Sequence, residues 1–302
     1  MFQFLNSTPY IIKSRNSKEL INNLLADKHP ILMEGLHCCY YLDDKRLADR
    51  KIIVRTHNIE QVYYRKLSQA ETNPLKKIYF ARAASKLENF EKKLSNASAI
   101  AAISAPDTEY YLCYHPKTVT VSAFHPDNKL NINQGKGDFV LYHGNLSVGE
   151  NNLAALFLVK EIFSKIDIPF IIAGSNPSAE LNAEVAKHEH IQLRDNYSTV
   201  QITELIRMAH INLLPTFQST GIKLKLLSAL HNGKFCLVNS PMVIGTGLEK
   251  FCIIRDSPQE IISEIITLMK QAFTEDEIKM RTELLSGDFS NSVNADRLIL
   301  IL

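Results

Sequence analysis

Residues 213–233 read LLPTFQSTGIKLKLLSALHNG, and this stretch decides the fold that we expect. An apolar run ends at Pro215, a loop of small hydroxyl residues follows, and a helical pattern starts near Gly221. Free backbone N–H groups and the positive end of the helix dipole make such a helix start an anion site. Ser219 and Thr220 can add hydroxyl donors there, and Gly221 lets the backbone approach a ligand closely.

Two lysines, Lys223 and Lys225, fall within the first turn or so of the expected helix. Cations are unfavourable beside the positive end of a helix dipole, so this placement favours a bound anion such as a diphosphate. The alternative is that Ser219 or Thr220 only caps the helix and that the lysines point into water. The residues alone leave both interpretations open.

Outward from this stretch, short apolar runs alternate with helical patterns, which is typical of βαβ units and a mostly parallel sheet. In the first half we expect strands at 30–33, 51–54 and 99–103 and helices at 59–69 and 74–94. In the second half we expect strands at 139–142, 169–172, 211–214, 235–238 and 252–255, and helices at 152–164, 200–210, 221–231 and from a cap at 256–260 to about 273. Ser104, with Asp107 after it, fits a helix N-cap.

The length and one polar segment predict two domains. At about 150 residues per domain, 302 residues suffice for two cores. Residues 128–138 are polar, contain two glycines and show no periodicity, which indicates a linker. We place one domain at 1–130 and another at 136–275, and we expect 276–302 to be a helical segment that packs back on the first.

Glycine and charge are unevenly distributed between the two halves. Of 11 glycines only Gly35 precedes residue 135, and the first half has no G-x-G, which excludes an N-terminal dinucleotide fingerprint. Residues 1–134 hold 19 Lys and Arg against 13 Asp and Glu, whereas residues 135–302 hold 15 against 19. The basic first half could face an anionic membrane or acceptor, or it could be a solvated positive surface.

Cysteine and histidine spacing indicates neither disulfides nor a metal. The five cysteines are odd in number and lack C-x-x-C spacing, and Cys236 and Cys252 lie in strand-like runs that predict buried free thiols. No histidine set or carboxylate cluster has ligand spacing, so we expect no metal. The start of the chain lacks a signal-peptide pattern, and no run of 18 apolar residues occurs. We therefore expect a reduced cytoplasmic protein, with peripheral contact at the inner membrane face.

Several blocks, in order, resemble the retaining family 4 glycosyltransferases of the GT-B fold, over most of residues 30–275. The stretch 213–233, with Gly245-Thr-Gly247 downstream, is similar to the strand, loop and helix of that family's C-terminal domain. The other matching blocks are Tyr142-His-Gly-Asn-Leu146, Ile172-Ala-Gly174, Arg55-Thr-His-Asn-Ile-Glu60 with Tyr63-Tyr64, and Ala102-Ile-Ser104 with Asp107.

The resemblance implies an α/β, GT-B fold in which two Rossmann-like domains face each other across a cleft. It further implies a nucleotide-diphosphate sugar as donor substrate, with no cofactor, and a retaining transfer to a glycan or lipid-linked acceptor in cell-surface polysaccharide synthesis. The implied catalytic residues are His57, Lys223 and Lys225. The implied donor-binding residues are Gly144, Asn145, Gly174, Ser219, Thr220, Gly221 and Ser228.

Four residues are candidates for the acceptor side. Asn58 and Glu60 lie in the matched segment that contains His57. Glu34 and His37 follow a first-half strand and could contact an acceptor, although core or capping roles are equally compatible with their positions. His143, at a strand end, could line the cleft.

The sequence also departs from the family pattern. Two glutamates spaced E-x7-E are usual across the second-domain helix, and Thr220 and Ser228 stand there instead. The first domain is short and would lack its first strands, which leaves open sheet edges. A partner chain could cover them, or the chain could be a catalytically impaired relative that acts as a binding or partner subunit. A nucleotide-sugar epimerase of the same fold has less support, and nothing predicts nucleic-acid binding.

Overall fold

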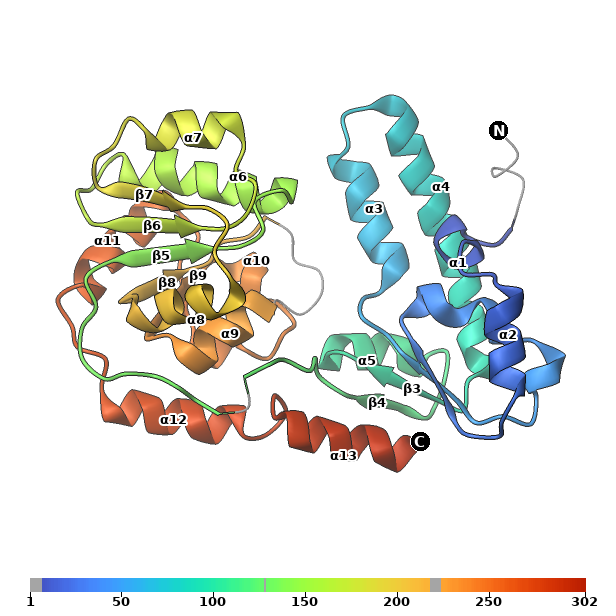
Figure 1. Cartoon of the computed structure of the whole chain (residues 1–302). Coiled ribbons are helices and arrows are strands. Elements are labelled where there is room, and N and C mark those ends of the chain that lie inside the picture. The colour runs from blue at the N-terminus through green and yellow to red at the C-terminus, as the bar shows by residue number, and fades with distance from the viewer. Residues whose placement is uncertain (1–6, 128, 218–223) are drawn as a thin grey trace. The chain divides into compact units, whose positions relative to one another are not determined.

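The computed structural model describes residues 7–127, 129–217 and 224–302 (Figure 1). These residues form two compact units. Unit 1 comprises the described residues up to Ala123 together with Asn291–Leu302, and unit 2 runs from Phe124 to Ser290. No helix in the described part of the chain is long and apolar enough to cross a membrane.

Unit 1 is built on a four-stranded sheet in which every pairing is parallel. Its strands, in spatial order, are β1 (Ile31–Glu34), β2 (Ile52–Arg55), β3 (Ala99–Ala102) and β4 (Thr118–Thr120). Its longer helices are α2 (Lys18–Leu25), α3 (Glu60–Ala70), α4 (Pro74–Glu91), α5 (Ala105–Leu112) and α13 (Asn291–Ile301). Shorter helical elements are α1 (Tyr10–Lys13), η2 (Leu36–Tyr41), η3 (Lys45–Leu47) and η4 (Lys92–Asn96).

The two central strands of unit 1, β2 and β3, are buried on both faces, which explains why they are almost wholly apolar. Ile52 and Val54 of β2 belong to the larger core, with Leu87 of α4. Ile53, between them, points the other way into a smaller core that includes Leu298 of α13. The last helix of the chain therefore closes one face of the sheet that is made by its first third.

Local capping sets the helix starts in unit 1. Asn73 accepts hydrogen bonds from the backbone of Leu75 and Lys76, and Pro74 occupies the first turn, so α4 begins where the sequence predicts. Ser104 accepts from the backbone N–H of Asp107 and caps α5, which confirms the predicted cap.

Unit 2 contains a six-stranded parallel sheet with the spatial order β10-β9-β8-β5-β6-β7. The strands are β5 (Val140–His143), β6 (Phe170–Ala173), β7 (Ile191–Arg194), β8 (Ile211–Leu213), β9 (Phe235–Val238) and β10 (Ile253–Ile254). The chain builds β5, β6 and β7 outward in one direction and then returns to add β8, β9 and β10 on the other side of β5. This is the doubly wound arrangement, with its switch point between β5 and β8.

Helices cover both faces of this sheet, as Figure 1 shows. They are α6 (Gly149–Phe157), α7 (Ala179–Val185), α8 (Thr199–Met208), α9 (Leu224–Asn232), α10 (Ser240–Val243), α11 (Pro258–Leu268) and α12 (Glu275–Leu285), with a π-helical continuation of α6 at Leu158–Phe163 and a 3-10 turn, η6, at Glu249–Phe251. The buried Arg281 of α12 donates hydrogen bonds to the carbonyls of Leu230, Gly233 and Lys234, so it ties α12 to the end of α9.

Several predicted boundaries are wrong by a few residues. Helix α8 ends at Met208 rather than 210, α11 ends at Leu268 rather than 273, and α6 begins at Gly149 rather than 152. All five cysteines are free thiols, and Cys236 is buried as predicted, whereas Cys252 is only partly buried. Burial raises the pKa of the Cys236 thiol to about 11.

Candidate functional site

The carboxyl ends of β5 and β8 in unit 2 meet at the topological switch point of the sheet. In open parallel sheets, ligands bind in the crevice beyond the strand ends at such a point. The sequence places Tyr142, His143 and Gly144 at the end of β5, and Pro215 and Thr216 just after β8.

The structure brings Gly144 and Gly174 together, at the ends of the neighbouring strands β5 and β6. A Cβ atom on Gly174 would lie 1.9 Å from the carbonyl oxygen of Gly144, so no other residue fits there without moving the backbone. A Cβ atom on Gly144 would lie 3.2 Å from the Asn151 side chain. These two predicted donor-binding glycines thus allow the two strand-end loops to approach closely.

We expect Gly174→Ala to lower the free energy of unfolding by roughly 1–3 kcal/mol, because the new methyl group overlaps a backbone carbonyl. Thermal or urea unfolding measures this loss. Gly149→Ala is the matched control, since a Cβ atom on Gly149 would meet nothing within 4 Å. Equal stability of the two variants would contradict the close approach of the loops.

Asn145 organises the loop after β5. Its side-chain oxygen accepts hydrogen bonds from the backbone N–H and the hydroxyl of Ser147, at 3.1 and 2.7 Å. Its carbonyl accepts from the side-chain amide of Asn151 at 3.0 Å. In this structure the Asn145 side-chain oxygen therefore holds the turn that leads into α6.

Lys225 lies in the first turn of α9 as described, with its ammonium group directed at the β5–α6 junction. Its Nζ donates to the side-chain oxygen of Asn151 at 3.1 Å and lies 5.1 Å from the centroid of the Tyr142 ring. The Tyr142 hydroxyl donates to the carbonyl of Asn151 at 3.0 Å. Ser228 follows Lys225 by three residues on the same helix face and is half-buried.

His143, at the end of β5, is buried, with its side chain only 5% exposed. Burial, together with the nearby Lys225 charge, lowers the pKa of His143 to about 3, so the imidazole is neutral near pH 7. Its Nε2 has no hydrogen-bond partner among the described residues. The strand end therefore combines a fixed cation with a neutral ring.

Sequence reasoning missed a second set of contacts at this strand end. The Thr216 hydroxyl donates to the carboxylate of Glu150, in the first turn of α6. Asn239, which follows β9, accepts from the Thr216 N–H at 2.9 Å and donates to its carbonyl at 2.7 Å. Glu150 and Asn239 are polar residues that come soon after buried strands, which makes them candidate site residues. The sequence does not show that either of them contacts Thr216.

The predicted anion-binding residues Ser219, Thr220, Gly221 and Lys223 lie outside the described residues. The part of the predicted donor site that the structure describes therefore consists of Gly144, Asn145, Gly174, Lys225 and Ser228. It provides one cation and closely apposed glycine backbones, a combination that suits a phosphate-bearing ligand.

In unit 1, a second cluster lies at the carboxyl ends of β1 and β2. The Nε2 of His57 lies 2.8 Å from the carboxylate of Glu34, and both side chains are partly exposed. Arg55, buried and paired in register with Glu34, lies 3.4 Å from the same carboxylate oxygen and donates to the carbonyl of Ser122 at 3.0 Å. The structure therefore unites two predicted residues that are 23 positions apart.

The remaining acceptor-side candidates surround this pair. The His37 ring centroid lies 6.4 Å from that of His57, and burial, then the Arg15 and His57 charges, lowers the pKa of His37. The carbonyl of Asn58 accepts a hydrogen bond from the buried Tyr111 hydroxyl at 2.9 Å. Burial raises the pKa of Glu60, and the nearby His57 opposes this effect.

Gly35 forms the turn after β1 that brings His37 close to the Glu34–His57 pair. Its φ of +88° is in the left-handed region, and a Cβ atom there would lie 2.4 Å from the His37 ring. A carboxylate that orients an imidazole can share a proton with it or hold it as a hydrogen-bond partner for a sugar hydroxyl. Within the described ranges, no group of three or more His, Cys, Asp or Glu side chains could hold a metal ion.

The class of fold follows from two features. The chain forms two α/β units, each with a parallel sheet, and the sheet of unit 2 has a topological switch point of the kind at which ligands bind. The chain has the GT-B fold of glycosyltransferases, as the sequence predicts. The trehalose-phosphate synthase (UDP-forming) from Burkholderia xenovorans, solved with glucose-6-phosphate, matches 94% of this chain and 75% of its own with a TM-score of 0.66 and 10% identity. TarM matches 93% of this chain and 57% of its own with a TM-score of 0.64 and 11% identity.

One curated relative is similar in sequence. It is an uncharacterized 44.6 kDa protein in the cps region of Klebsiella pneumoniae, 26% identical over 262 residues, which are 82% of this chain and 65% of the relative. The chain thus spans slightly less than two thirds of that protein's length. A mutant of S. aureus TarM, which is also similar in structure (TM-score 0.63, 11% identity), has been solved with fondaparinux, α-GlcNAc-glycerol and UDP. No family model matches the chain.

Proposed function

We propose that the chain is a retaining family 4 type glycosyltransferase that takes a sugar from a nucleotide-diphosphate sugar bound by unit 2. The acceptor is a glycan or a lipid-linked glycan in cell-surface polysaccharide synthesis, and no cofactor or metal takes part. The observation that carries the proposal is the close Gly144–Gly174 approach, with Lys225 beside it, at the switch point of a GT-B fold. The relative in a cps region supports the polysaccharide assignment.

On the donor side, Lys225 offsets the charge that develops on the departing nucleoside diphosphate, a role suited to a compact ammonium charge. Lys223 shares that role, and Ser219, Thr220 and Gly221 bind the diphosphate with backbone and hydroxyl donors. Ser228 lies beside the ribose, where the family has a glutamate. Gly144, Asn145 and Gly174 form the floor of the donor site.

On the acceptor side, His57 contacts the transferred sugar or the attacking hydroxyl. Glu34 orients its imidazole through the 2.8 Å contact, and Arg55 keeps the Glu34 carboxylate in place. His37, Asn58 and Glu60 shape the surface around this pair. The buried Tyr111 supports the arrangement by holding the Asn58 carbonyl.

The test is titration calorimetry with UDP-, GDP- and TDP-sugars, followed by a transfer assay with the nucleotide sugar that binds. Donor binding with transfer supports the proposal. If none of these nucleotide sugars binds, the proposal is wrong.

A second candidate is a catalytically impaired relative that binds the donor and acts as a partner subunit. Ser228 favours it, because a serine is uncharged and shorter than the glutamate that usually contacts the ribose. The sheet of unit 1 also favours it, since β1 is an edge strand of the described sheet and an edge strand can pair with a partner chain. Donor binding without any transfer would select this candidate.

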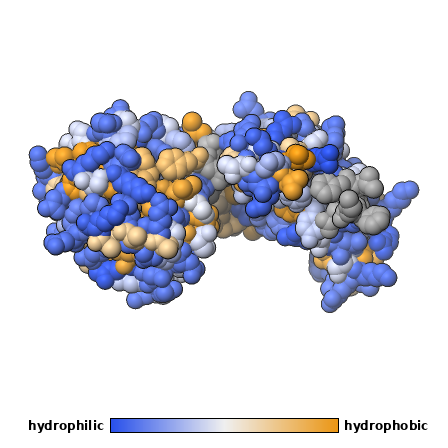
Figure 2. Space-filling model, turned by 90° about the horizontal axis from the view of Figure 1, so that it is seen from above, coloured by the Kyte–Doolittle hydropathy of each residue, from blue (hydrophilic) through white to orange (hydrophobic). Residues whose placement is uncertain are grey.

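We also propose that α4 makes peripheral contact with the cytoplasmic membrane face. Leu75, Ile78 and Tyr79, near its start, are 78, 50 and 39% exposed, with Lys76 and Lys77 between them. Figure 2, which looks down on this end of α4, shows apolar side chains amid a hydrophilic surface. Exposed apolar residues next to cations are typical of helices that lie on anionic lipid.

Wild-type protein is therefore expected to sediment with vesicles that contain phosphatidylglycerol and to remain in solution with purely zwitterionic ones. Leu75→Asp combined with Ile78→Asp is expected to abolish sedimentation, because it removes apolar area and adds negative charge. Leu153→Asp, on an exposed leucine of unit 2, is the control. Sedimentation that the α4 variant retains would rule this surface out.

A further inference from the structure

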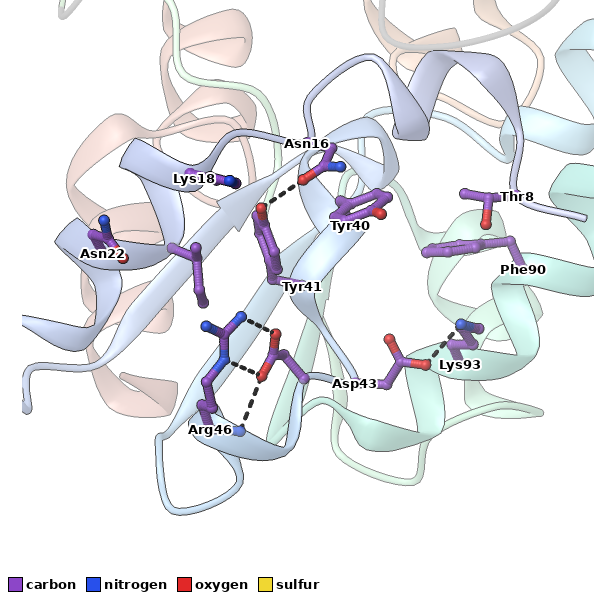
Figure 3. Close-up of a pocket in the computed structure, with 12 residues that line it drawn as sticks. Thr8, Asn16, Lys18, Asn22, Tyr40, Tyr41, Asp43, Arg46, Phe90 and Lys93 are labelled. Atoms are coloured by element: carbon purple, nitrogen blue, oxygen red, sulfur yellow. Dashed lines mark hydrogen bonds and ion pairs between the residues drawn. The ribbon is translucent and has the colours of Figure 1, made fainter. Parts of the chain in front are cut away.

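Unit 1 contains a cavity of about 630 Å³ that includes none of the residues assigned above. Its walls are formed by the start of α2 with the turn before it, by the stretch from the end of η2 into η3, and by the end of α4 with η4; Thr8 also lines it (Figure 3). Its volume is within the range of about 300–1,000 Å³ that small-molecule sites occupy. It is large enough for a sugar unit.

Aromatic side chains give the cavity flat, fixed walls. In Figure 3, Tyr40 and Tyr41 from η2 and Phe90 from α4 surround the opening. The Tyr41 hydroxyl is shared between the Asn16 side-chain oxygen at 2.7 Å and the Ser17 carbonyl at 2.8 Å. Tyr40 packs edge-to-face on Tyr41, with ring centroids 4.9 Å apart. These contacts fix the walls before any ligand binds.

The charged groups of the cavity are mostly paired with one another. Asp43 pairs with Lys93 at 2.7 Å, and the Lys93 ammonium also lies 5.2 Å from the centroid of the Phe90 ring. Asp44 accepts two hydrogen bonds from the Arg46 guanidinium, which lower the pKa of that carboxyl to about 2. The Asp44 carboxyl therefore stays ionised at physiological pH, and Arg46 and Lys93 each lie in an ion pair.

Two exposed polar side chains of α2, Lys18 and Asn22, remain available to a ligand. Neither has a hydrogen bond or ion pair in the described part of the chain, and both line the cavity. Lys18 leaves the cavity with one uncompensated positive charge. Asn22 offers an amide donor and acceptor, the pair of functions that a sugar hydroxyl uses.

We propose that this cavity binds an acidic sugar unit of a glycan, with its carboxylate on Lys18 and a hydroxyl on Asn22. The apolar face of a pyranose ring can pack on the aromatic walls. Asp43, which pairs with Lys93, can accept a hydrogen bond from a further hydroxyl, and Arg46, which pairs with Asp44, can donate one. A surface lysine alone attracts any anion. Because Lys18 lies beside fixed aromatic rings, the cavity favours a sugar ring that carries a negative charge.

A single element, η2, connects the cavity to the His57–Glu34 pair. That the bound glycan is the acceptor of sugar transfer rests on the proposed function. Helix η2 starts directly after Glu34 and Gly35 and ends at Tyr40 and Tyr41. Because η2 is kinked at Cys39, its six residues span at most about 12 Å, at roughly 2 Å per residue of 3-10 helix. A glycan of a few sugar units can therefore occupy the cavity while another unit lies beside His57.

The test is saturation-transfer NMR and calorimetry on the full chain without nucleotide, using trigalacturonate, cellotriose and inorganic phosphate as probes. We expect trigalacturonate to bind and the other two to bind about tenfold more weakly or not at all. No binding of trigalacturonate, equal binding of cellotriose, or equal binding of phosphate would each overturn the proposal.

Variants on one helix locate the site. Lys18→Ala and Asn22→Ala are expected to weaken trigalacturonate binding by about tenfold and about threefold. Asn23→Ala, on the next residue of α2, is the matched control and is expected to bind normally; Lys28→Ala is the charge control. Unchanged affinity in Lys18→Ala would overturn the assignment. Donor calorimetry distinguishes this failure from that of the proposed function, because donor binding does not involve this cavity.

Discussion

Replacing His57 with alanine is expected to abolish sugar transfer while the affinity for the nucleotide sugar stays nearly unchanged. His57 and its partner Glu34 belong to unit 1, whereas the described donor candidates belong to unit 2. Removing a group that donates or accepts a proton or hydrogen bond at a reacting centre costs about 100- to 10,000-fold in rate. The measurement is release of nucleoside diphosphate under saturating donor, with donor affinity from calorimetry.

Glu34→Gln tests whether Glu34 acts by orienting the His57 imidazole or through its negative charge. Glutamine can still accept a hydrogen bond from the His57 ring, so we expect a smaller loss of kcat than in His57→Ala. His29→Ala, on an exposed histidine of the same unit, is the control and is expected to retain full activity. A His57→Ala protein with wild-type transfer would remove this residue from the proposed mechanism.

Lys225→Ala is expected to weaken donor binding by roughly 10- to 100-fold, since a hydrogen bond to a charged group contributes about 1.5–3 kcal/mol. Lys225 contacts Asn151 and the Tyr142 ring at the switch point, so the loss falls on the nucleotide sugar rather than on the acceptor. Calorimetry with the preferred nucleotide sugar measures it.

Lys160→Ala is the matched control, because Lys160 pairs with Glu180 on the surface of the same unit and such pairs contribute little. Thermal unfolding of both variants shows whether Lys225→Ala remains folded. A folded Lys225→Ala protein that binds the donor as tightly as the wild type would contradict the donor site as proposed.

The strands that the sequence predicts well are those buried on both faces. Every residue of β2, β3, β5 and β9 is buried, and their sequences are nearly continuous apolar runs. β7 escaped prediction because its residues alternate between buried and exposed, with Gln192 and Arg194 on the exposed side. β4 escaped because it has only three residues, two of them threonine.

In the candidate site, residues in local sequence motifs could be predicted, whereas contacts between residues far apart in the chain could not. The positions of Gly144, Gly174 and His57 just after strands could be predicted, because each lies in a short block with a recognisable pattern. The Thr216–Glu150 and Thr216–Asn239 contacts could not, because they join residues 66 and 23 positions apart whose proximity only the strand order decides. The cavity between α2, η2 and α4 could not be predicted for the same reason, since these elements come from distant parts of the chain.

Helix α13 has a consequence for how the protein is made. Leu298 fills the smaller core against Ile53 and Ala101, and Asn294 accepts a hydrogen bond from the backbone of Ser122 at 2.9 Å. The sheet of unit 1 therefore lacks the contacts of α13 on one face until residues 291–302 have been synthesised, which is after all of unit 2. Unit 1 cannot complete its fold before unit 2 has been translated.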